Sequence, residues 1–119
     1  VNKLTSIGKG QLNEELGLIQ TNLLGAIATV NAAVEWFKQA GGGQLVGISS
    51  LASLTPIPKQ AAYCATKAAF SMYLDSAAIE LKKYNIDVRS VAAPVLFQLT
   101  PGNCSSHCWP TCPRVCGAT

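Results

Sequence analysis

The feature that most constrains this chain is a long stripe of apolar residues in its first third. Between positions 12 and 37, apolar residues recur at steps of three or four, a spacing that places them on one face of a helix. Gly41, Gly42 and Gly43 follow, and glycine readily adopts the left-handed conformation that ends a helix. A phosphate-binding glycine loop would instead follow a strand and precede a helix. We therefore predict a helix over residues 12–40, whose apolar face comprises Leu12, Leu16, Ile19, Leu23, Ile27, Val30, Val34 and Phe37.

The remaining chain predicts an alternation of strand and helix. Residues 44–49 are short, mostly apolar and bounded by Gly and Ser, which is typical of a buried parallel strand. A loop follows, in which Pro56 and Pro58 disfavour a helix. A second helix is expected over residues 61–84, with Asn85 as its cap, and a second strand over residues 86–92. The face of this helix comprises Tyr63, Lys67, Phe70, Leu74, Ala77 and Leu81.

This alternation predicts an α/β fold, a Rossmann-like doubly wound parallel sheet with right-handed crossovers. The sheet is expected to be incomplete, because open sheets of this class have five or six strands and only two are evident here. Val1 and Asn2 are interpreted as the stub of a third strand. We expect residues 1–102 to form a partial Rossmann-like region and residues 103–119 an irregular cysteine-rich tail.

Composition narrows the classes of partner. The 119 residues carry nine basic and six acidic side chains without a basic run, which argues against nucleic-acid or anionic-membrane partners. The uncharged stretch from Leu16 to Val34 approaches membrane-spanning length but contains Gln20, Asn22 and Asn31, so no transmembrane segment is expected. No secretory signal is evident, and a cytoplasmic location is expected. With only 13% charged residues, the chain is expected to leave apolar faces for another subunit or further sequence.

The tail has four cysteines spaced four residues apart, with His107 among them. Zinc sites usually pair cysteines two residues apart on turns, and Pro110 and Pro113 interrupt the helix that would suit this period. We expect no metal, although a zinc site, disulfides or an unstructured tail each remain open. A thiol nucleophile formed by Cys64 with His107 is a further, weaker alternative. The tail cysteines are Cys104, Cys108, Cys112 and Cys116.

The chemistry-bearing pattern is Tyr63 followed four residues later by Lys67, which places both side chains on one helix face. A nearby cation favours the phenolate and lowers the pKa of a tyrosine, so Tyr63 could exchange a proton with an alcohol or carbonyl. The alternative is an interfacial tyrosine beside a lysine whose stem packs on apolar surface. Ser50 follows the first strand, where parallel sheets bind ligands, and Asn22 lies within the first helix, an unfavourable place for an unpartnered amide.

Together, Thr-Asn-Leu-Leu-Gly around Asn22, Gly-Ile-Ser-Ser ending at Ser50, Tyr63-Cys-Ala-Thr-Lys67 and Ile-Asp-Val-Arg-Ser-Val resemble the short-chain dehydrogenase/reductase family over about residues 9–92. The resemblance implies hydride transfer between NAD or NADP and a small-molecule carbonyl or secondary alcohol. It implies that Tyr63 is the general acid or base, that Lys67 binds the nicotinamide ribose and that Ser50 bonds the substrate oxygen.

The resemblance further implies that Asn22 holds a water in the proton relay. Pro94 and Thr100 correspond to positions beside the nicotinamide, although the sequence around them departs from the family pattern. The family's glycine-rich cofactor motif is not in this chain, so the fragment alone is expected to be weakly active or inactive. A non-catalytic association module that pairs through helices 12–40 and 61–84 is the alternative, and the family commonly forms homo-oligomers through these helices.

Overall fold

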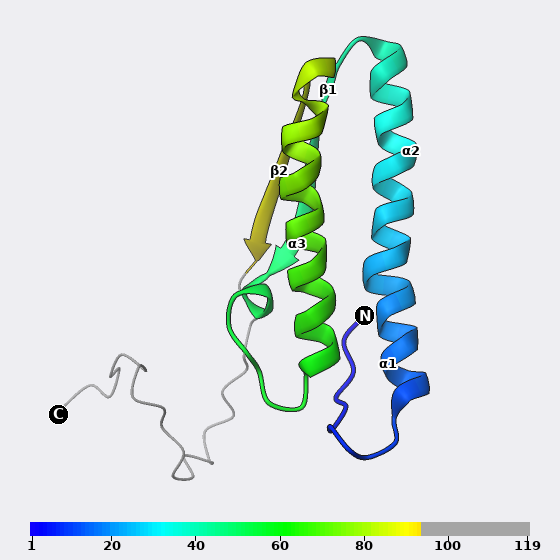
Figure 1. The fold of residues 1–119 in the computed structure, drawn as a ribbon, viewed down its shortest axis with the longest axis vertical. Helices are drawn as coiled ribbons and strands as arrows, with labels where there is room; N and C mark the ends of the chain where they lie inside the picture. Colours follow the sequence, from blue (N-terminus) through cyan, green and yellow to red (C-terminus); the bar gives the residue numbers. More distant parts are fainter. Residues whose placement is uncertain (94–119) are drawn as a thin grey trace, which may run out of the picture.

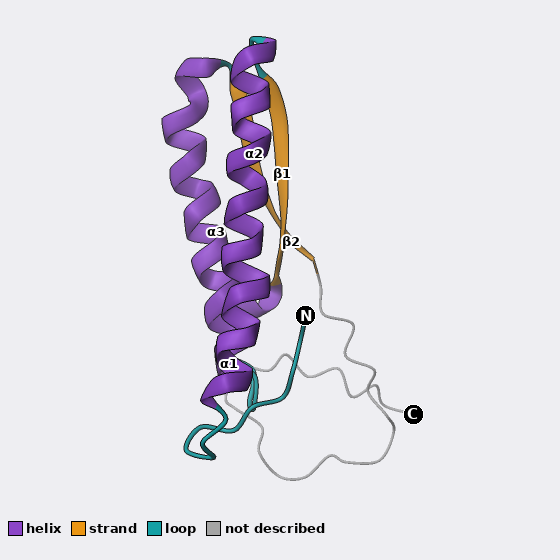
Figure 2. Cartoon of the chain, turned by 90° about the vertical axis from the view of Figure 1, so that its right-hand side faces the viewer, coloured by secondary structure: helices purple, strands orange, loops and turns teal. Residues whose placement is uncertain are grey.

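The computed structural model describes residues 1–93, which form a helical layer over one face of a two-stranded sheet (Figures 1 and 2). Strands β1 (Gly43–Ser50) and β2 (Ile86–Ala93) pair in parallel, from Gly43 opposite Ile86 to Ser50 opposite Ala93. The α/β class and both strands are confirmed, and each strand differs by no more than one residue at either end from its prediction. The expected strand stub at Val1 and Asn2 is wrong: these residues are in irregular structure and pair with neither strand.

The first helix is continuous over Leu12–Ala40 but changes its geometry. It consists of α1 (Leu12–Ile19), the π-helical turn η1 (Gln20–Leu24) and α2 (Gly25–Ala40). A π-turn adds a residue to one turn and rotates everything before it relative to everything after it. The apolar stripe is therefore right within α2, where Val30 and Val34 are buried, and wrong in α1, where Leu12 is 63% exposed and Leu18 is buried instead.

The helix ends confirm the expected caps. Gly41 has a φ of 85°, and the next residue, Gly42, donates its N–H to the Phe37 carbonyl oxygen at 2.9 Å. Helix α3 (Ala61–Leu81) continues into the 3₁₀ turn η3 (Lys82–Tyr84) and ends at Asn85, whose φ is 59°. Glycine and asparagine tolerate this left-handed conformation better than other residues, so both turns into the strands follow from the local sequence.

The hydrophobic core lies between the sheet and helices α2 and α3. Gly47 faces α3 at a point where a Cβ atom would collide with the side chain of Leu74, so the missing side chain lets α3 approach the strand. Core packing of this kind fixes the distance between α3 and the carboxyl end of β1. The buried residues are Val30, Val34, Leu45, Phe70, Leu74, Leu81, Ile86 and Val88.

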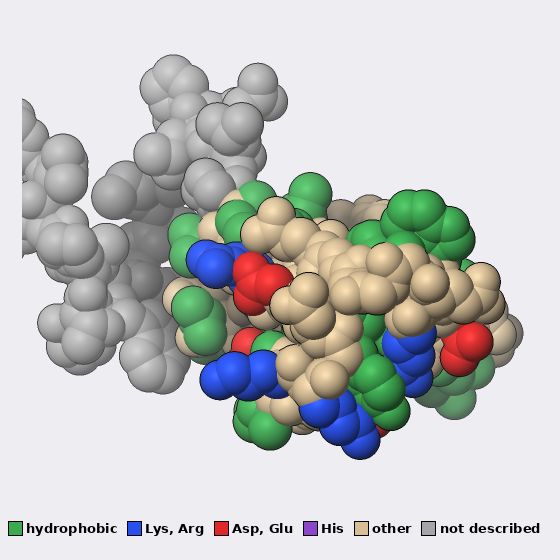
Figure 3. Space-filling model, turned by 90° about the horizontal axis from the view of Figure 1, so that it is seen from above, with side chains coloured by type: hydrophobic (Ala, Val, Ile, Leu, Met, Phe, Trp, Pro, Cys, Tyr) green, Lys and Arg blue, Asp and Glu red, His purple; other side chains and the backbone are tan. Residues whose placement is uncertain are grey.

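Apolar side chains also remain exposed on the described part of the chain. Val46, Ile48 and Val91 lie on the sheet face away from the helices, and Trp36 and Met72 are exposed on the helical layer. Viewed from above, hydrophobic side chains reach the surface on several sides of the molecule (Figure 3). The expectation of uncovered apolar faces is confirmed for residues 1–93.

Helix Leu12–Ala40 is long and apolar enough to cross a membrane by length and composition alone. This is weak evidence, because core helices meet the same criteria. Here Val30 and Val34 pack into the core, and the buried Asn22 forms side-chain hydrogen bonds to the backbone of Val1. These contacts support the expectation that this helix does not span a membrane, and that expectation stays a prediction.

Candidate active site

Tyr63 and Lys67 lie in the first half of α3 and are both half-buried. The Lys67 ammonium is 6.0 Å from the centre of the Tyr63 ring, so the cation lies beside the aromatic side chain four residues earlier. The same Nζ donates to the Ile48 carbonyl oxygen of β1 at 3.3 Å. Lys67 therefore joins the tyrosine to the last part of the strand, two residues before Ser50.

Ser50 ends β1 and is buried. Its Oγ accepts a hydrogen bond from the Ala52 N–H at 3.2 Å, and its carbonyl oxygen accepts one from the Ser53 hydroxyl at 2.6 Å. These side-chain bonds cap the 3₁₀ turn η2 (Leu51–Ser53), whose N-cap residue is Ser50. Because Oγ is used as an acceptor, the hydroxyl proton of Ser50 can still be donated to a ligand oxygen.

Asn22 lies in the π-turn η1 and is buried despite its polar side chain. Its Oδ1 accepts from the Val1 backbone nitrogen at 2.8 Å, and its Nδ2 donates to the Val1 carbonyl oxygen at 2.6 Å. Both ends of the amide thus have partners, which removes the penalty that the sequence position suggested. Single π-turns occur frequently at functional sites, and this one packs against α3.

The structure brings Tyr63 and Lys67 together and ties Lys67 to the strand that ends at Ser50. It places Asn22 on the turn beside α3, with its amide bonded to Val1 and to neither Tyr63 nor Lys67 among the described residues. Pro94 and Thr100 lie outside the described residues, as do His107 and the four tail cysteines. The arrangement thus presents a phenol, a cation and a hydroxyl near the carboxyl end of β1, where parallel sheets bind ligands.

Two serines support this arrangement and were not singled out from the sequence. The buried Ser49 shares a 2.6 Å hydrogen bond with the Ser71 hydroxyl, and its Oγ also lies 3.3 Å from the Lys67 carbonyl oxygen. These contacts hold α3 against β1 at the level of Lys67. The alternation of side chains along a strand could have identified Ser49 from the sequence, because it places Ser49 on the same inward face as Leu45 and Gly47.

The chain matches the family model described as short chain dehydrogenase over residues 4–105. Among curated proteins, it is 36% identical over 75 residues to an uncharacterized oxidoreductase of Myxococcus xanthus, covering 63% of this chain and 30% of that protein. It is 32% identical over 79 residues to a NAD-dependent glycerol dehydrogenase of Listeria innocua, covering 66% of this chain and 31% of the relative. The chain therefore spans about a third of the length of these relatives.

Solved structures give the same architecture. Acetoin dehydrogenase from Enterobacter cloacae is 27% identical, with a TM-score of 0.76 over 80% of this chain and 39% of its own. A 4-hydroxyisoleucine dehydrogenase complexed with NADH and succinate is 25% identical, with a TM-score of 0.73 over 77% of this chain and 44% of its own. These matches confirm that the two strands and their helices have the architecture of part of a Rossmann-like fold.

Proposed function

This chain belongs to the short-chain dehydrogenase family, and from that membership we propose that it carries the proton-transfer half of a nicotinamide-dependent oxidoreductase site. The reaction interconverts a small-molecule secondary alcohol and its carbonyl. The observation that carries the proposal is the position of Lys67, which lies beside the Tyr63 ring and bonds the last part of β1, just before Ser50. In this proposal one cation acts on both the phenol and a ligand at the strand end.

Tyr63 exchanges the proton in this proposal. In the direction of oxidation the phenolate removes the alcohol proton, and in reduction the phenol returns it to the carbonyl oxygen. Ser50 donates its hydroxyl proton to the substrate oxygen, where negative charge develops in the transition state.

Asn22 has a supporting role in the proposal. Beyond its two bonds to Val1, the Asn22 amide keeps one N–H donor and one oxygen lone pair, and with these we propose that it orients a water between Lys67 and solvent. Its burial in the π-turn and its two bonds to Val1 hold the side chain in one orientation, which supports a positioned rather than a mobile amide. The proton removed from the substrate would leave by this route.

The residues present fit the nicotinamide half of NAD or NADP. The Lys67 ammonium makes one hydrogen bond among the described residues and has three N–H donors, so donors remain for ribose hydroxyls. Tyr63 supplies a further hydroxyl beside them, and Pro94 and Thr100 are proposed on the carboxamide side. When bound, the nicotinamide would supply or accept the hydride. Pyrophosphate contacts are proposed to come from sequence equivalent to the family's first strands.

The activities of relatives support an alcohol or ketone as substrate. One relative is a NAD-dependent glycerol dehydrogenase, and another, 26% identical over 91 residues, is a 7alpha-hydroxysteroid dehydrogenase of Clostridium sardiniense. Both names describe dehydrogenation of a hydroxyl group. They differ greatly in substrate size, so the class proposed here is the secondary alcohol or carbonyl group itself.

Titration with NADH and NADPH, followed by nicotinamide fluorescence, tests the cofactor part of the proposal. Circular dichroism on the same sample establishes that the chain is folded. We expect saturable but weak binding, lost in Lys67→Met and kept in Lys9→Met, a control that removes an exposed cation elsewhere. Equal binding by both variants would contradict the role of Lys67.

Complementation tests the proton-transfer part. The chain is mixed with a polypeptide that supplies the first strands of the Myxococcus xanthus relative, and turnover of a panel of secondary alcohols and ketones is measured. We expect Tyr63→Phe to abolish turnover but to weaken cofactor binding much less than Lys67→Met does, because it removes the hydroxyl that carries the exchangeable proton and leaves the Lys67 donors in place. Turnover that survives this substitution would refute the assignment of Tyr63.

The exposed helix side chains favour self-association as a second property of the chain. Trp36 and Met72 are each about two-thirds exposed, far more than large apolar side chains in a covered helix. We propose that helices 12–40 and 61–84 pair with a second copy, which Met72→Lys should weaken in a sedimentation experiment. Association unaffected by this change would leave α3 outside the interface.

A further inference from the structure

Two hydroxyl groups join β1 to α3 just before Ser50. The Ser49 Oγ lies 2.6 Å from the Ser71 Oγ and 3.3 Å from the Lys67 carbonyl oxygen. A carbonyl oxygen accepts hydrogen bonds but cannot donate them, so both bonds form only when Ser71 donates to Ser49 and Ser49 donates to Lys67. The two hydroxyl protons therefore have one arrangement, which is a directed chain of hydrogen bonds that ends on the backbone of Lys67.

This chain of bonds replaces a contact that Ser71 would otherwise make within its own helix. A helical serine commonly donates to the carbonyl oxygen four residues earlier, as Ser76 does to Met72 at 2.9 Å in the same helix. For Ser71 that acceptor is the Lys67 carbonyl oxygen, but Ser49 of the strand bonds both groups instead. The strand hydroxyl is thus inserted at the turn of α3 that carries Lys67.

Lys67 is consequently attached to β1 at both of its ends. Its carbonyl oxygen accepts from Ser49, and its ammonium donates to the carbonyl oxygen of the preceding strand residue, Ile48, at 3.3 Å. The side chain between these two points is a flexible four-carbon stem, which loses conformational entropy when it is held in one geometry. Fixing the Lys67 backbone against the strand keeps the Ile48 carbonyl within reach of the ammonium.

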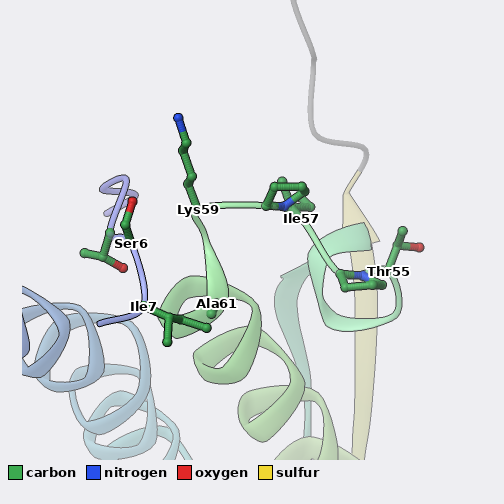
Figure 4. Close-up of a pocket in the computed structure, with 9 residues that line it drawn as sticks. Ser6, Ile7, Thr55, Ile57, Lys59 and Ala61 are labelled. Atoms are coloured by element: carbon green, nitrogen blue, oxygen red, sulfur yellow. The ribbon is translucent and has the colours of Figure 1, made fainter. Parts of the chain in front are cut away.

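The hydrophobic core holds α3 beyond Lys67 rather than before it. The residues that α3 contributes to this core, from Phe70 to Leu81, all follow Lys67 in the sequence. Before Lys67, the helix begins at Ala61 beside a cavity of about 660 Å³ between the N-terminal segment and the loop that precedes the helix (Figure 4). The hydroxyl chain therefore joins strand and helix at the edge of the core, beside the candidate active site.

We propose that Ser49 and Ser71 are positioning residues for Lys67. Their hydroxyl chain holds the turn of Lys67 against β1, so that the ammonium stays beside the Tyr63 ring and the end of the strand. The inference rests on the proposed function, in which Lys67 binds the nicotinamide ribose. Both serines act through Lys67, whereas a purely structural pair would contribute to stability alone.

The Ile48 carbonyl reports the position of Lys67 without any nucleotide. Ile48–Ser49 is the one Ile-Ser sequence in the chain, so labelling Ile with ¹³C at its carbonyl and Ser with ¹⁵N gives a single correlated NMR signal. We expect Lys67→Met to move this ¹³C signal, because it removes the donor, and Ser71→Ala to move it in the same direction. Ser76→Ala, at an exposed serine of the same helix, is the matched control and should leave it in place. A signal that responds to Lys67→Met but not to Ser71→Ala would refute the positioning role.

Titration with NADH, followed by nicotinamide fluorescence, tests whether this placement matters to the cofactor. We expect Ser71→Ala to weaken NADH binding by about three- to tenfold, the effect of one hydrogen bond, and Ser71→Thr, which keeps a hydroxyl, to bind like the unsubstituted chain. In a chain that carries Lys67→Met, Ser71→Ala should change the affinity by less than about twofold, because the serine acts through the lysine. An equal loss with and without Lys67 would overturn the proposal.

A double variant separates positioning from stability. Ser49→Ala combined with Ser71→Ala removes both hydroxyls, so neither is left buried without a partner, and the thermal unfolding midpoint should stay close to that of the unsubstituted chain. NADH binding should be weakened as much as by Ser71→Ala alone. A double variant that unfolds at a clearly lower temperature but binds NADH like the unsubstituted chain would make the pair purely structural and refute the proposal.

Failure of this inference and failure of the proposed function give different results. Equal NADH affinity of the unsubstituted chain and Lys67→Met would contradict the cofactor role of Lys67. An Ile48 signal that ignores Ser71→Ala would instead contradict the positioning role. Because the Ile48 measurement involves neither nucleotide nor turnover, it decides the positioning role by itself.

Discussion

The two faces of the β1–β2 sheet differ sharply in what covers them. On the helical side, Leu45 and Val88 are buried and Gly47 accommodates the side chain of Leu74. On the opposite side, Ile48 lies across from Val91 in the parallel register, yet these two residues are 67% and 49% exposed. The bare face is nevertheless apolar at this end of the strands, where the candidate active site also lies.

This difference shows which part of a fold the chain supplies. Strands with apolar residues on both faces are typical of parallel sheets covered by helices on both sides. The described residues cover one face, and the chain spans 39% of the acetoin dehydrogenase that it matches. The helical layer and the residues proposed to transfer the proton therefore lie in one stretch of chain, whereas the second layer is proposed to come from the part of the family sequence that this chain does not span.

On the covered face, truncation of Leu74 should cause the largest loss of unfolding free energy. Leu74 is 1% exposed and packs between Gly47 and the rest of the core, so Leu74→Ala should leave a cavity and cost about 2–5 kcal/mol of unfolding free energy. Urea denaturation followed by circular dichroism measures the loss. Met72→Ala on the same helix is the control and should change stability by less than about 0.5 kcal/mol. Similar losses from both would show that the covered face is not specifically packed.

Adding a methyl group to the covered face should reduce the unfolding free energy by less than truncating Leu74 does. Gly47→Ala places a Cβ atom against the side chain of Leu74 and should cost about 1–3 kcal/mol as the helix or side chain moves. The control, Gly17→Ala in α1, adds the same methyl group where no atom lies within 4 Å. It should stabilise the helix by up to about 1 kcal/mol. Opposite signs in thermal unfolding would confirm the difference, and equal signs would contradict it.

The bare face should tolerate polarity. Ile48→Thr keeps a β-branched side chain on the exposed side, so the unfolding free energy should change by no more than about 0.5 kcal/mol. Val88→Thr on the covered face should cost more than about 1 kcal/mol, because it buries a hydroxyl. Sedimentation of the same samples should show unchanged self-association for Ile48→Thr, because the proposed pairing surface is formed by helices 12–40 and 61–84. A large stability loss in that variant would mean that the bare face is covered within the chain itself.

Local signals explain which parts of the fold could be predicted. The caps at Gly41 and Asn85 depend on left-handed backbone conformations, and the strands depend on short apolar runs between turn residues. The π-turn was missed because regular spacing assumes 3.6 residues per turn throughout, so the buried face in α1 moved from Leu16 to Leu18.

In the candidate site, too, some contacts follow from the local sequence and others depend on long-range packing. The pairing of Tyr63 with Lys67 follows from helical periodicity, because residues four apart share a face. The bond from Lys67 to the Ile48 carbonyl oxygen depends on how far α3 stands from β1, which long-range packing decides. The backbone hydrogen bond from Thr5 to Lys59 likewise joins segments more than fifty residues apart, and no local sequence pattern indicates such a contact.

The smallest expected effect lies at the polar end of the bare face. The hydrogen bond from Arg89 Nε to Asp87 Oδ2, 2.8 Å long, lowers the pKa of the Asp87 carboxyl, assisted by the Arg89 charge and by Gln44. A lowered folded-state pKa adds stability above the unfolded value of about 3.9, and this contribution is lost as the pH falls through the folded value. Both side chains are exposed, so the gain should be slight.

Comparison of the parent chain with Asp87→Asn measures this contribution. The difference between their unfolding midpoints should be small and in favour of the parent at pH 6. It should begin to shrink as the pH falls below about 4 and disappear only below the lowered pKa of the folded Asp87 carboxyl. In an Arg89→Gln background, the pH-dependent difference between chains with and without Asp87→Asn should be lost, because Arg89→Gln removes both the hydrogen-bond donor and the positive charge beside the carboxylate. A difference that grows on acidification would contradict the sign of the shift. Such a result would mean that the folded protein stabilises the protonated form of Asp87, whereas an exposed carboxylate beside an arginine favours the ionised form.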